Sequence, residues 1–240
     1  MNNKQIPSAF VLGALICTGL ALLGYLISGG IIRIKALERT VTVKGLSERE
    51  VPADIAIWPI KFNEAENDLN KLFSNIEAKN ALIVNFLKDR GFEDQEISIS
   101  APSITDRLAQ GFVDAGKIPF RYTGDSTITV YTHNADAVIS GKKRLIELGK
   151  YGIVINTDEY NSPKAEFLFT KLNELKPEMI EEATRNAREV AEKFAKDSKS
   201  RLGKIKTASQ GQFSIDNRDS NTPHIKKVRV VSTIEYYLSD

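Results

Sequence analysis

The sequence contains very little cysteine, histidine or tryptophan. Its 240 residues include one Cys, two His and one Trp. The only cysteine, Cys17, lies in an apolar stretch, so no disulfide can form within the chain. Bulky Ile16 before it argues against a lipidation site. His133 and His224 lie in separate segments with no cysteine to complete a zinc site, and we predict no metal ion and no cofactor.

The chain also lacks an excess of charge of either sign. It has 33 basic and 31 acidic residues, a formal net charge of +2. Proteins that bind nucleic acid concentrate basic charge, because their affinity comes from neutralising phosphates. We therefore expect no nucleic-acid partner.

The common signatures of catalysis are missing as well. The sequence has no Gly-x-Gly-x-x-Gly, no phosphate-binding loop and no Gly-x-Ser-x-Gly, and we do not expect an enzyme. One alternative is a periplasmic hydrolase that uses acidic residues. Paired carboxylates for acid and base catalysis could come from neighbouring acidic residues, which are Glu48, Glu50, Asp54, Asp158 and Glu159.

One long apolar run is present near the N-terminus. No charged residue occurs between Lys4 and Arg33, and about 20 apolar residues suffice to cross a bilayer as a helix. No Ala-x-Ala cleavage site follows, which favours an uncleaved signal anchor over a cleaved signal peptide. We predict a cytoplasmic leader at 1–9, a transmembrane anchor at 10–32, a linker at 33–38 and an exported domain at 39–240. The anchor residues are Phe10, Leu12, Leu15, Leu20, Leu22, Leu26 and Ile31.

The orientation of the anchor is less clear from charge alone. Basic residues flank the span on both sides, so the positive-inside rule gives no decision or even favours the reverse. The very short leader is typical of an exported domain. We expect a single-pass protein of the inner membrane with most of its chain in the periplasm.

Alternating apolar residues predict strands throughout the exported domain. Runs with helical spacing at 68–90 and 135–148 predict two helices between them. With a third helix described below, the order β-β-α-β-β-α-β-β-α-β-β implies an α+β fold, with mixed, largely antiparallel sheets packed by three helices. The first two strands are expected to form a hairpin with a wide connection from Gly45 to Asp54. This hairpin, with Trp58, is a candidate assembly surface.

The stretch from Glu178 to Arg201 predicts a long helix with two faces. Its charges cancel, and Glu181–Arg185, Glu189–Lys193 and Glu192–Lys196 have the spacing of helical ion pairs. The opposite face carries small residues that allow close packing on a sheet, flanked by apolar residues that include Val190 and Phe194. These small residues are Ala183, Ala187, Ala191 and Ala195. Pro177 is expected to begin the helix and Gly203 to end it.

Several of these segments, taken in order, resemble the SIMPL-domain family, named for an adaptor that associates with a pelle-like kinase. They are Gly45 with Pro52-Ala53-Asp54, the Gly91-Phe92 turn before EISIS, the Tyr122 strand, GKYGIVIN, and the alanine-rich helix that runs into RLGKI. The resemblance covers about Arg39 to Leu238. It implies a periplasmic or surface domain without established catalysis, linked to stress tolerance, some of whose relatives assemble into rings.

We therefore expect a membrane-anchored envelope protein whose domain forms a homo-oligomer or binds an unknown protein partner. Tethering to the bilayer confines subunits to a plane and raises their effective concentration. The remaining alternative is a module that binds a peptide or ligand at an exposed sheet edge.

Overall fold

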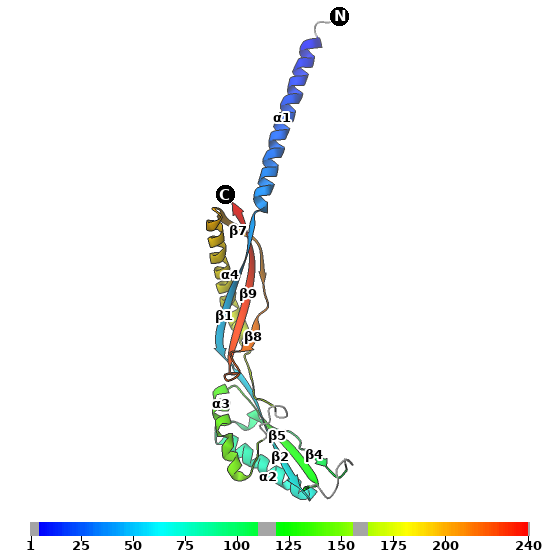
Figure 1. Ribbon diagram of the computed structural model, residues 1–240, viewed down its shortest axis with the longest axis vertical. Helices are drawn as coiled ribbons and strands as arrows, with labels where there is room; N and C mark the ends of the chain where they lie inside the picture. The colour runs from blue at the N-terminus through cyan, green and yellow to red at the C-terminus, as the bar shows by residue number, and fades with distance from the viewer. Residues whose placement is uncertain (1–4, 110–118, 156–162, 240) are drawn as a thin grey trace. The chain divides into compact units, whose positions relative to one another are not determined.

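The computed structural model describes residues 5–109, 119–155 and 163–239 and divides into two compact units (Figure 1). Unit 1 consists of residues 1–48, 176–214 and 229–240. Unit 2 consists of residues 49–175 and 215–228. The boundaries fall within long strands and within one helix, so the two units share continuous secondary structure.

The first helix, α1, runs from Gln5 to Glu38. It contains a 20-residue segment, Val11–Gly30, with a mean hydropathy of 2.1 and none of it buried. The helix continues through the stretch predicted as a linker, and β1 begins at Thr40. A long apolar helix with no protein surface against it is suited to a bilayer or to a signal sequence.

The first sheet has the strand order β1-β9-β7, and β8 also pairs with β9. Its strands are β1 (Thr40–Pro52), β7 (Arg201–Gln210), β8 (Ser214–Asn217) and β9 (Ile225–Ser239). Helix α4 (Leu172–Asp197) packs against β1 and β9. In the part of this sheet that lies in unit 1, Val43, Ile234 and Tyr236 form a small core with Ala187 and Ala191.

The second sheet has the order β3-β5-β2-β6, and β4 also pairs with β5. Its strands are β2 (Ile55–Glu66), β3 (Ile97–Ile99), β4 (Ser103–Asp106), β5 (Tyr122–Thr132) and β6 (Glu166–Leu168), all paired antiparallel. β5 pairs with β2 over the whole length of β5, from Thr132 opposite Ala56 to Tyr122 opposite Glu66.

Two helices and two short 3₁₀ segments complete unit 2. They are α2 (Leu69–Lys88), η1 (Asp94–Glu96), α3 (Ala135–Arg144) and η3 (Leu145–Tyr151). Asp68 caps α2 by accepting a hydrogen bond from the Lys71 N–H. The buried residues of α2 follow helical spacing and pack on the alternate residues Trp58, Ile60 and Phe62 of β2. Bulky side chains therefore fill the core of unit 2.

The α+β class is confirmed, with antiparallel sheets and three helices besides the N-terminal one. The predicted hairpin is wrong. Gly45 lies inside β1, which continues to Pro52, and only Ala53 and Asp54 separate it from β2. The strict burial alternation of β1 continues through the polar residues that suggested a loop. β1 and β2 belong to different sheets and therefore do not pair with each other.

The ends of the alanine-rich helix also differ from expectation. α4 begins at Leu172, so Pro177 is inside it rather than at its start. Pro177 lacks an N–H and cannot complete the hydrogen bond to the Asn173 carbonyl, and the boundary between the units falls close to it, between Leu175 and Lys176. The helix ends before Gly203 because Lys199 adopts a left-handed conformation, with φ of 54°.

The three ion pairs predicted on α4 do not form. The described residues of this helix show instead a pair between Arg188 and Glu192, 3.7 Å apart. Both side chains are about 60% exposed, so this pair contributes little to stability. The stability of α4 therefore depends on its packing face.

That face approaches β1 most closely at Gly45. A Cβ placed on Gly45 would lie 1.8 Å from the Ala183 carbonyl oxygen and 2.5 Å from the Ala187 nitrogen. The alanines Ala183, Ala187, Ala191 and Ala195 are between 0% and 3% exposed. Only glycine on the strand and small side chains on the helix allow this contact.

We predict that Gly45→Ala destabilises the protein by about 3 kcal/mol or more, because backbone atoms of α4 would have to move. Gly149→Ala is the matched control, since its Cβ would meet no atom within 4 Å and it should cost less than about 0.5 kcal/mol. Thermal unfolding of the detergent-solubilised chain, followed by circular dichroism, measures both. Equal melting temperatures for the two variants would contradict the close contact.

Candidate membrane anchor and assembly edge

Helix α1 is apolar on all sides, and its described apolar side chains are exposed. The described side chains Leu12, Leu15, Leu20, Leu22 and Leu26 are between 62% and 66% exposed, and Cys17 is also exposed. Phe10 and Ile31 belong to the helix, but their side chains lie outside those that the structure describes. A helix that is hydrophobic all round needs an apolar environment, which the rest of the described chain does not supply.

β1 is an edge strand whose free side can be assigned from two hydrogen bonds. The Arg39 carbonyl accepts from the Leu238 N–H of β9 at 2.8 Å, whereas the Leu46 carbonyl accepts from the Asn186 side chain at 2.8 Å. Backbone groups of successive strand residues point to opposite sides. The even-numbered residues Thr42 and Lys44 therefore direct their N–H and C=O groups away from β9.

Helix α4 covers the buried face of β1, and one row of its side chains lies beside this free side. Ser47 donates a hydrogen bond to Glu182 at 2.8 Å, and Asn186, four residues further, contacts Leu46. Residues four apart lie on the same side of a helix, so Val190 and Phe194 continue this row next to the first half of β1. They are 36% and 56% exposed, although the sequence predicted them in the buried stripe.

We call the following features the β1 edge: the outward backbone groups of Thr42 and Lys44 and the exposed side chains of Val190 and Phe194. It combines unpaired backbone groups with apolar side chains. Such edges pair with other strands unless charge, proline or irregularity prevents it. Lys44 is one such protective residue, and Pro52 stands at the end of the strand.

The opposite edge of the same sheet is different. The pairing of β7 with β9 shifts register twice, between Leu202 and Ile205 and between Ile205 and Thr207. Bulges of this kind twist an edge strand and hinder further pairing. The strict alternation of burial along β1 from Thr42 onward shows no such interruption. Of the two edges, β1 is therefore the better suited to pairing.

None of the three residues proposed for the assembly hairpin lies on this surface. Gly45 is covered by α4, and Trp58 is 2% exposed and packs against Phe92, with ring centroids 6.2 Å apart. Asp54 is partly exposed, but it belongs to a hydrogen-bonded corner in unit 2. The sequence signals for the β1 edge were the alternation of Val41 and Val43 with polar residues and the Asn186-Val190-Phe194 spacing.

The carboxylate of Asp54 is held by one residue. Thr170 donates its backbone N–H to Oδ1 at 2.8 Å and its hydroxyl to Oδ2 at 2.7 Å. Burial raises the pKa of Asp54, but the hydrogen bonds from Thr170 oppose this effect, and the pKa lies below its ordinary value. His133 Nδ1 lies 3.2 Å from the Asp54 carbonyl oxygen. A carboxylate engaged in this way fixes the start of β2 against the segment before α4.

The other acidic residues of the hydrolase hypothesis are placed as follows. Glu50 forms an ion pair with Arg218 at 3.4 Å, and Glu48 lies two residues before Glu50 on the same exposed face of β1. Asp158 and Glu159 lie outside the described residues. Among residues 5–109, 119–155 and 163–239, no three His, Cys, Asp or Glu side chains are placed to hold a metal ion.

Comparison with protein families adds one finding. A family model described as SIMPL, protein of unknown function (DUF541), matches residues 41–233, which is most of the chain. The chain belongs to the SIMPL family. The match begins in β1 and ends in β9, so the family domain includes both sheets and excludes α1. A comparison with curated proteins finds no match.

The corner at Asp54 in this SIMPL domain should make stability depend on acid pH. Because the folded pKa is below the unfolded value of about 4, its contribution is present above pH 4 and is lost as pH falls through the folded pKa. We predict that Asp54→Asn costs about 1 kcal/mol at pH 7, a modest value because the group is partly exposed. The cost should shrink at pH 3, as measured by urea unfolding at both pH values. A cost that is the same at both pH values would contradict a charged acceptor at Asp54. Thr170→Val keeps the backbone donor and should therefore lower the free energy of unfolding by less than Asp54→Asn does.

Proposed function

We propose that this SIMPL protein is anchored in the inner membrane by α1, and that its periplasmic domain self-associates through the β1 edge and acts by binding rather than by catalysis. One observation carries the proposal: an apolar helical segment of 20 residues is followed, ten residues later, by a strand with a free edge. The stress tolerance that the family resemblance implies belongs to the same proposal.

The anchor is supported by length and composition. Val11–Gly30 at about 1.5 Å per residue spans about 30 Å, the thickness of the hydrocarbon core. A cleaved signal sequence would leave the same domain in the periplasm without an anchor.

Self-association is supported by the chemistry of the β1 edge. The outward backbone groups of Thr42 and Lys44 can form hydrogen bonds with another strand, and Val190 and Phe194 can bury apolar area beside it. Two copies tethered in one membrane meet at high effective concentration, so even a modest contact is populated. A second copy is always present near the first, whereas a peptide ligand for the same edge would have to be supplied.

A binding role is also supported by how the carboxylates are used. Both oxygens of Asp54 accept hydrogen bonds from Thr170, and Glu50 faces Arg218. A general base needs a lone pair directed at a substrate. These carboxylates are instead engaged by neighbouring residues of the same chain.

The anchor and its orientation are tested in cells. We predict that alkaline carbonate leaves the full-length protein in the membrane, and that protease added to spheroplasts degrades the domain while intact cells protect it. The matched control replaces Leu15 and Leu20 with Lys, which should prevent membrane retention because each charge in the centre of a span costs about 3 kcal/mol. Release of the wild-type protein by carbonate, or protection of the domain in spheroplasts, would contradict the proposal.

The assembly surface is tested by Thr42→Pro. Proline removes an N–H that points away from β9, so it blocks pairing at the edge while leaving the β1–β9 ladder intact. We predict that the wild-type chain in detergent has the mass of an oligomer and that Thr42→Pro has the mass of a monomer, both by light scattering corrected for detergent.

The matched control is Thr42→Val, which keeps the N–H and should remain an oligomer. A monomeric wild-type protein would overturn self-association and favour the binding of a peptide at the same edge. A Thr42→Pro protein that stays oligomeric would place the contact elsewhere.

A further inference from the structure

The residues that follow the membrane helix are bound directly to the turn at the end of α4. The Arg39 guanidinium donates a hydrogen bond to the Ser200 hydroxyl at 3.0 Å, and Arg201 pairs with Ser239 across β7 and β9. The end of α4, the start of β7 and the end of β9 thus lie beside the start of β1 (Figure 1). This end of unit 1 is the part of the fold that the chain holds nearest to α1.

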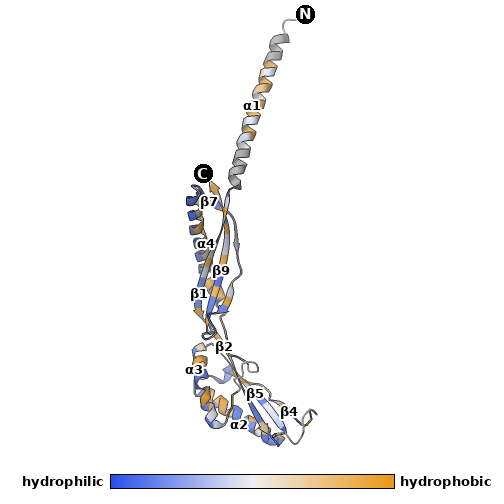
Figure 2. Cartoon of the chain, in the orientation of Figure 1, coloured by the Kyte–Doolittle hydropathy of each residue, from blue (hydrophilic) through white to orange (hydrophobic). Residues whose placement is uncertain are grey.

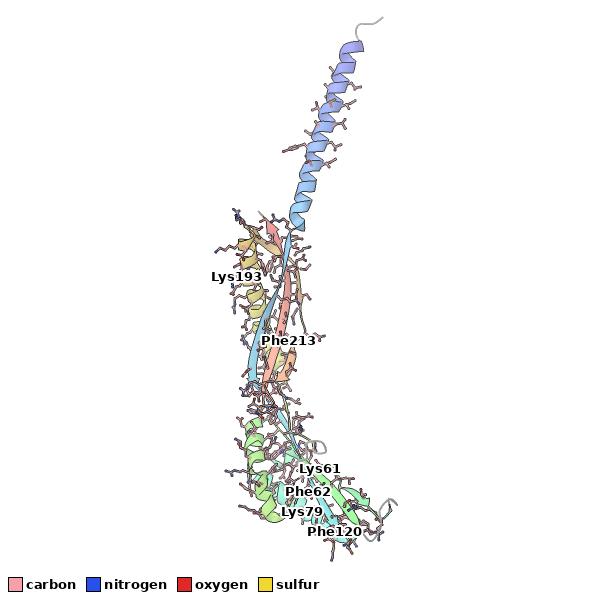
Figure 3. All side chains as sticks on the ribbon, viewed as in Figure 1. Lys61, Phe62, Lys79, Phe120, Lys193 and Phe213 are labelled. Carbon is pink, nitrogen blue, oxygen red and sulfur yellow. The ribbon has the colours of Figure 1, made fainter. Side chains whose placement is uncertain are left out.

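That end is strongly basic. Between Lys193 and Lys204 the chain has five basic residues and one acidic residue, whereas the first part of α4, from 172 to 182, has four acidic and one basic. The five basic side chains are all exposed: Lys193, Lys196, Lys199, Arg201 and Lys204. Figure 3 labels Lys193 on the outer side of α4, and Figure 2 shows the hydrophilic character of this helix. We call this surface the basic end.

Its charges are not neutralised within the fold. Along the described residues 183–210, the ion pairs are Arg188 with Glu192 and Lys206 with Glu235, and neither includes a residue of the basic end. Basic residues near a helix C-terminus are favoured by the helix dipole, which accounts for Lys193 and Lys196. It does not account for Arg201 and Lys204, which are on β7.

Lys199 occupies a position where glycine would be favoured. Its N–H donates to the Lys196 carbonyl at 3.0 Å, and the Ser200 N–H donates to the Ala195 carbonyl at 2.8 Å. These are the two hydrogen bonds of a Schellman turn, whose left-handed residue is usually glycine. With φ of 54°, Lys199 is the one described non-glycine residue with positive φ. Lys199 therefore has a backbone conformation that is less favourable for lysine than for glycine.

The anchor brings the basic end close to the membrane surface. Arg39 is nine residues beyond Gly30, the end of the apolar segment, and α1 is helical to Glu38. Nine helical residues span about 14 Å, and the interaction of exposed charges decays over about 8 Å at physiological salt. Side chains of lysine and arginine extend further, so the basic end lies within range of lipid headgroups.

We propose that the basic end binds anionic phospholipid headgroups of the membrane that holds α1. Clusters of four or more basic residues beside a transmembrane helix attract anionic lipids, and this cluster is preformed by the Arg39–Ser200 contact and the Schellman turn. The contact holds the domain against the bilayer beside its own anchor. The inference rests on the proposed insertion of α1 and holds for either orientation of the anchor.

The test uses the full-length chain in nanodiscs of phosphatidylcholine alone or of equal parts phosphatidylcholine and phosphatidylglycerol. Acylation of lysine side chains is followed by mass spectrometry. We expect acylation of Lys193, Lys196 and Lys199 to be several-fold slower with phosphatidylglycerol, and this protection to disappear in high salt. Lys142 and Lys143 of α3 are the internal controls and should be unaffected. Equal rates at the basic end in both lipids would overturn the proposal.

Lys199→Gly separates lipid binding from folding. Glycine suits the left-handed position, so this variant should melt at about 2–4 °C higher than the wild type. It should nevertheless lose part of the protection at Lys196 in phosphatidylglycerol. The control is Lys142→Gln, which removes one positive charge as Lys199→Gly does and should leave the protection of Lys196 intact. Glycine is not used at position 142 because this residue is inside a helix. Full protection in Lys199→Gly would show that Lys199 is not part of the lipid contact.

Two further arms identify the source of any protection. Inorganic phosphate added to phosphatidylcholine nanodiscs should not protect the basic end, and protection by phosphate alone would contradict a lipid site. Co-elution of the chain with both kinds of nanodisc reports insertion of α1. Failure to co-elute would contradict the proposed anchor, whereas co-elution with equal acylation rates would contradict only the lipid contact.

Discussion

The close approach of α4 to β1 at Gly45 is the contact on which unit 1 depends. Four alanines and a glycine contribute little apolar area individually, so the stabilisation must come from many short-range contacts between backbones at small separation. Such packing allows little adjustment, because a single added methyl group would overlap backbone atoms. Hydrogen bonds from Ser47 to Glu182 and from Asn186 to Leu46 then fix the helix along the strand.

This contact also decides which surfaces remain available. Asn186 satisfies the outward carbonyl of Leu46, whereas the outward groups of Thr42 and Lys44 lie before this contact in the strand. The same helical row that supplies Glu182 and Asn186 to the strand continues as Val190 and Phe194, which have no strand residue to cover them. An edge with both unpaired backbone groups and exposed apolar side chains is the direct result, and this combination favours pairing over solvation.

Unit 2 is stabilised in a different way. Its core contains bulky side chains from β2, β5 and α2, and Trp58 is enclosed there by Phe92 and by Gly141, where a Cβ would lie 2.9 Å from the indole ring. The polar corner at Asp54 closes this unit through Thr170. The charges of α4, in contrast, are segregated from an acidic start to a basic end, which places the basic residues beside the start of β1, where α1 enters the domain.

The sequence by itself determined the elements whose signals are local. The apolar run of α1, the alternation in β2 and β5, the helical spacing of α2 and the alanine stripe of α4 each depend on residues that are near one another in the chain, and the order of segments identified the SIMPL family. The helix ends were less predictable, because Pro177 and Gly203 give signals that the surrounding packing overrides. The two residues that follow β1 gave no sign that the chain there changes sheets. Only the tertiary structure decided three features: which edge of β1 is free, the contact of Asp54 with Thr170, and the position of Lys199 beside Arg39. Each depends on contacts between residues more than a hundred positions apart. A single sequence carries no periodic signal for such contacts.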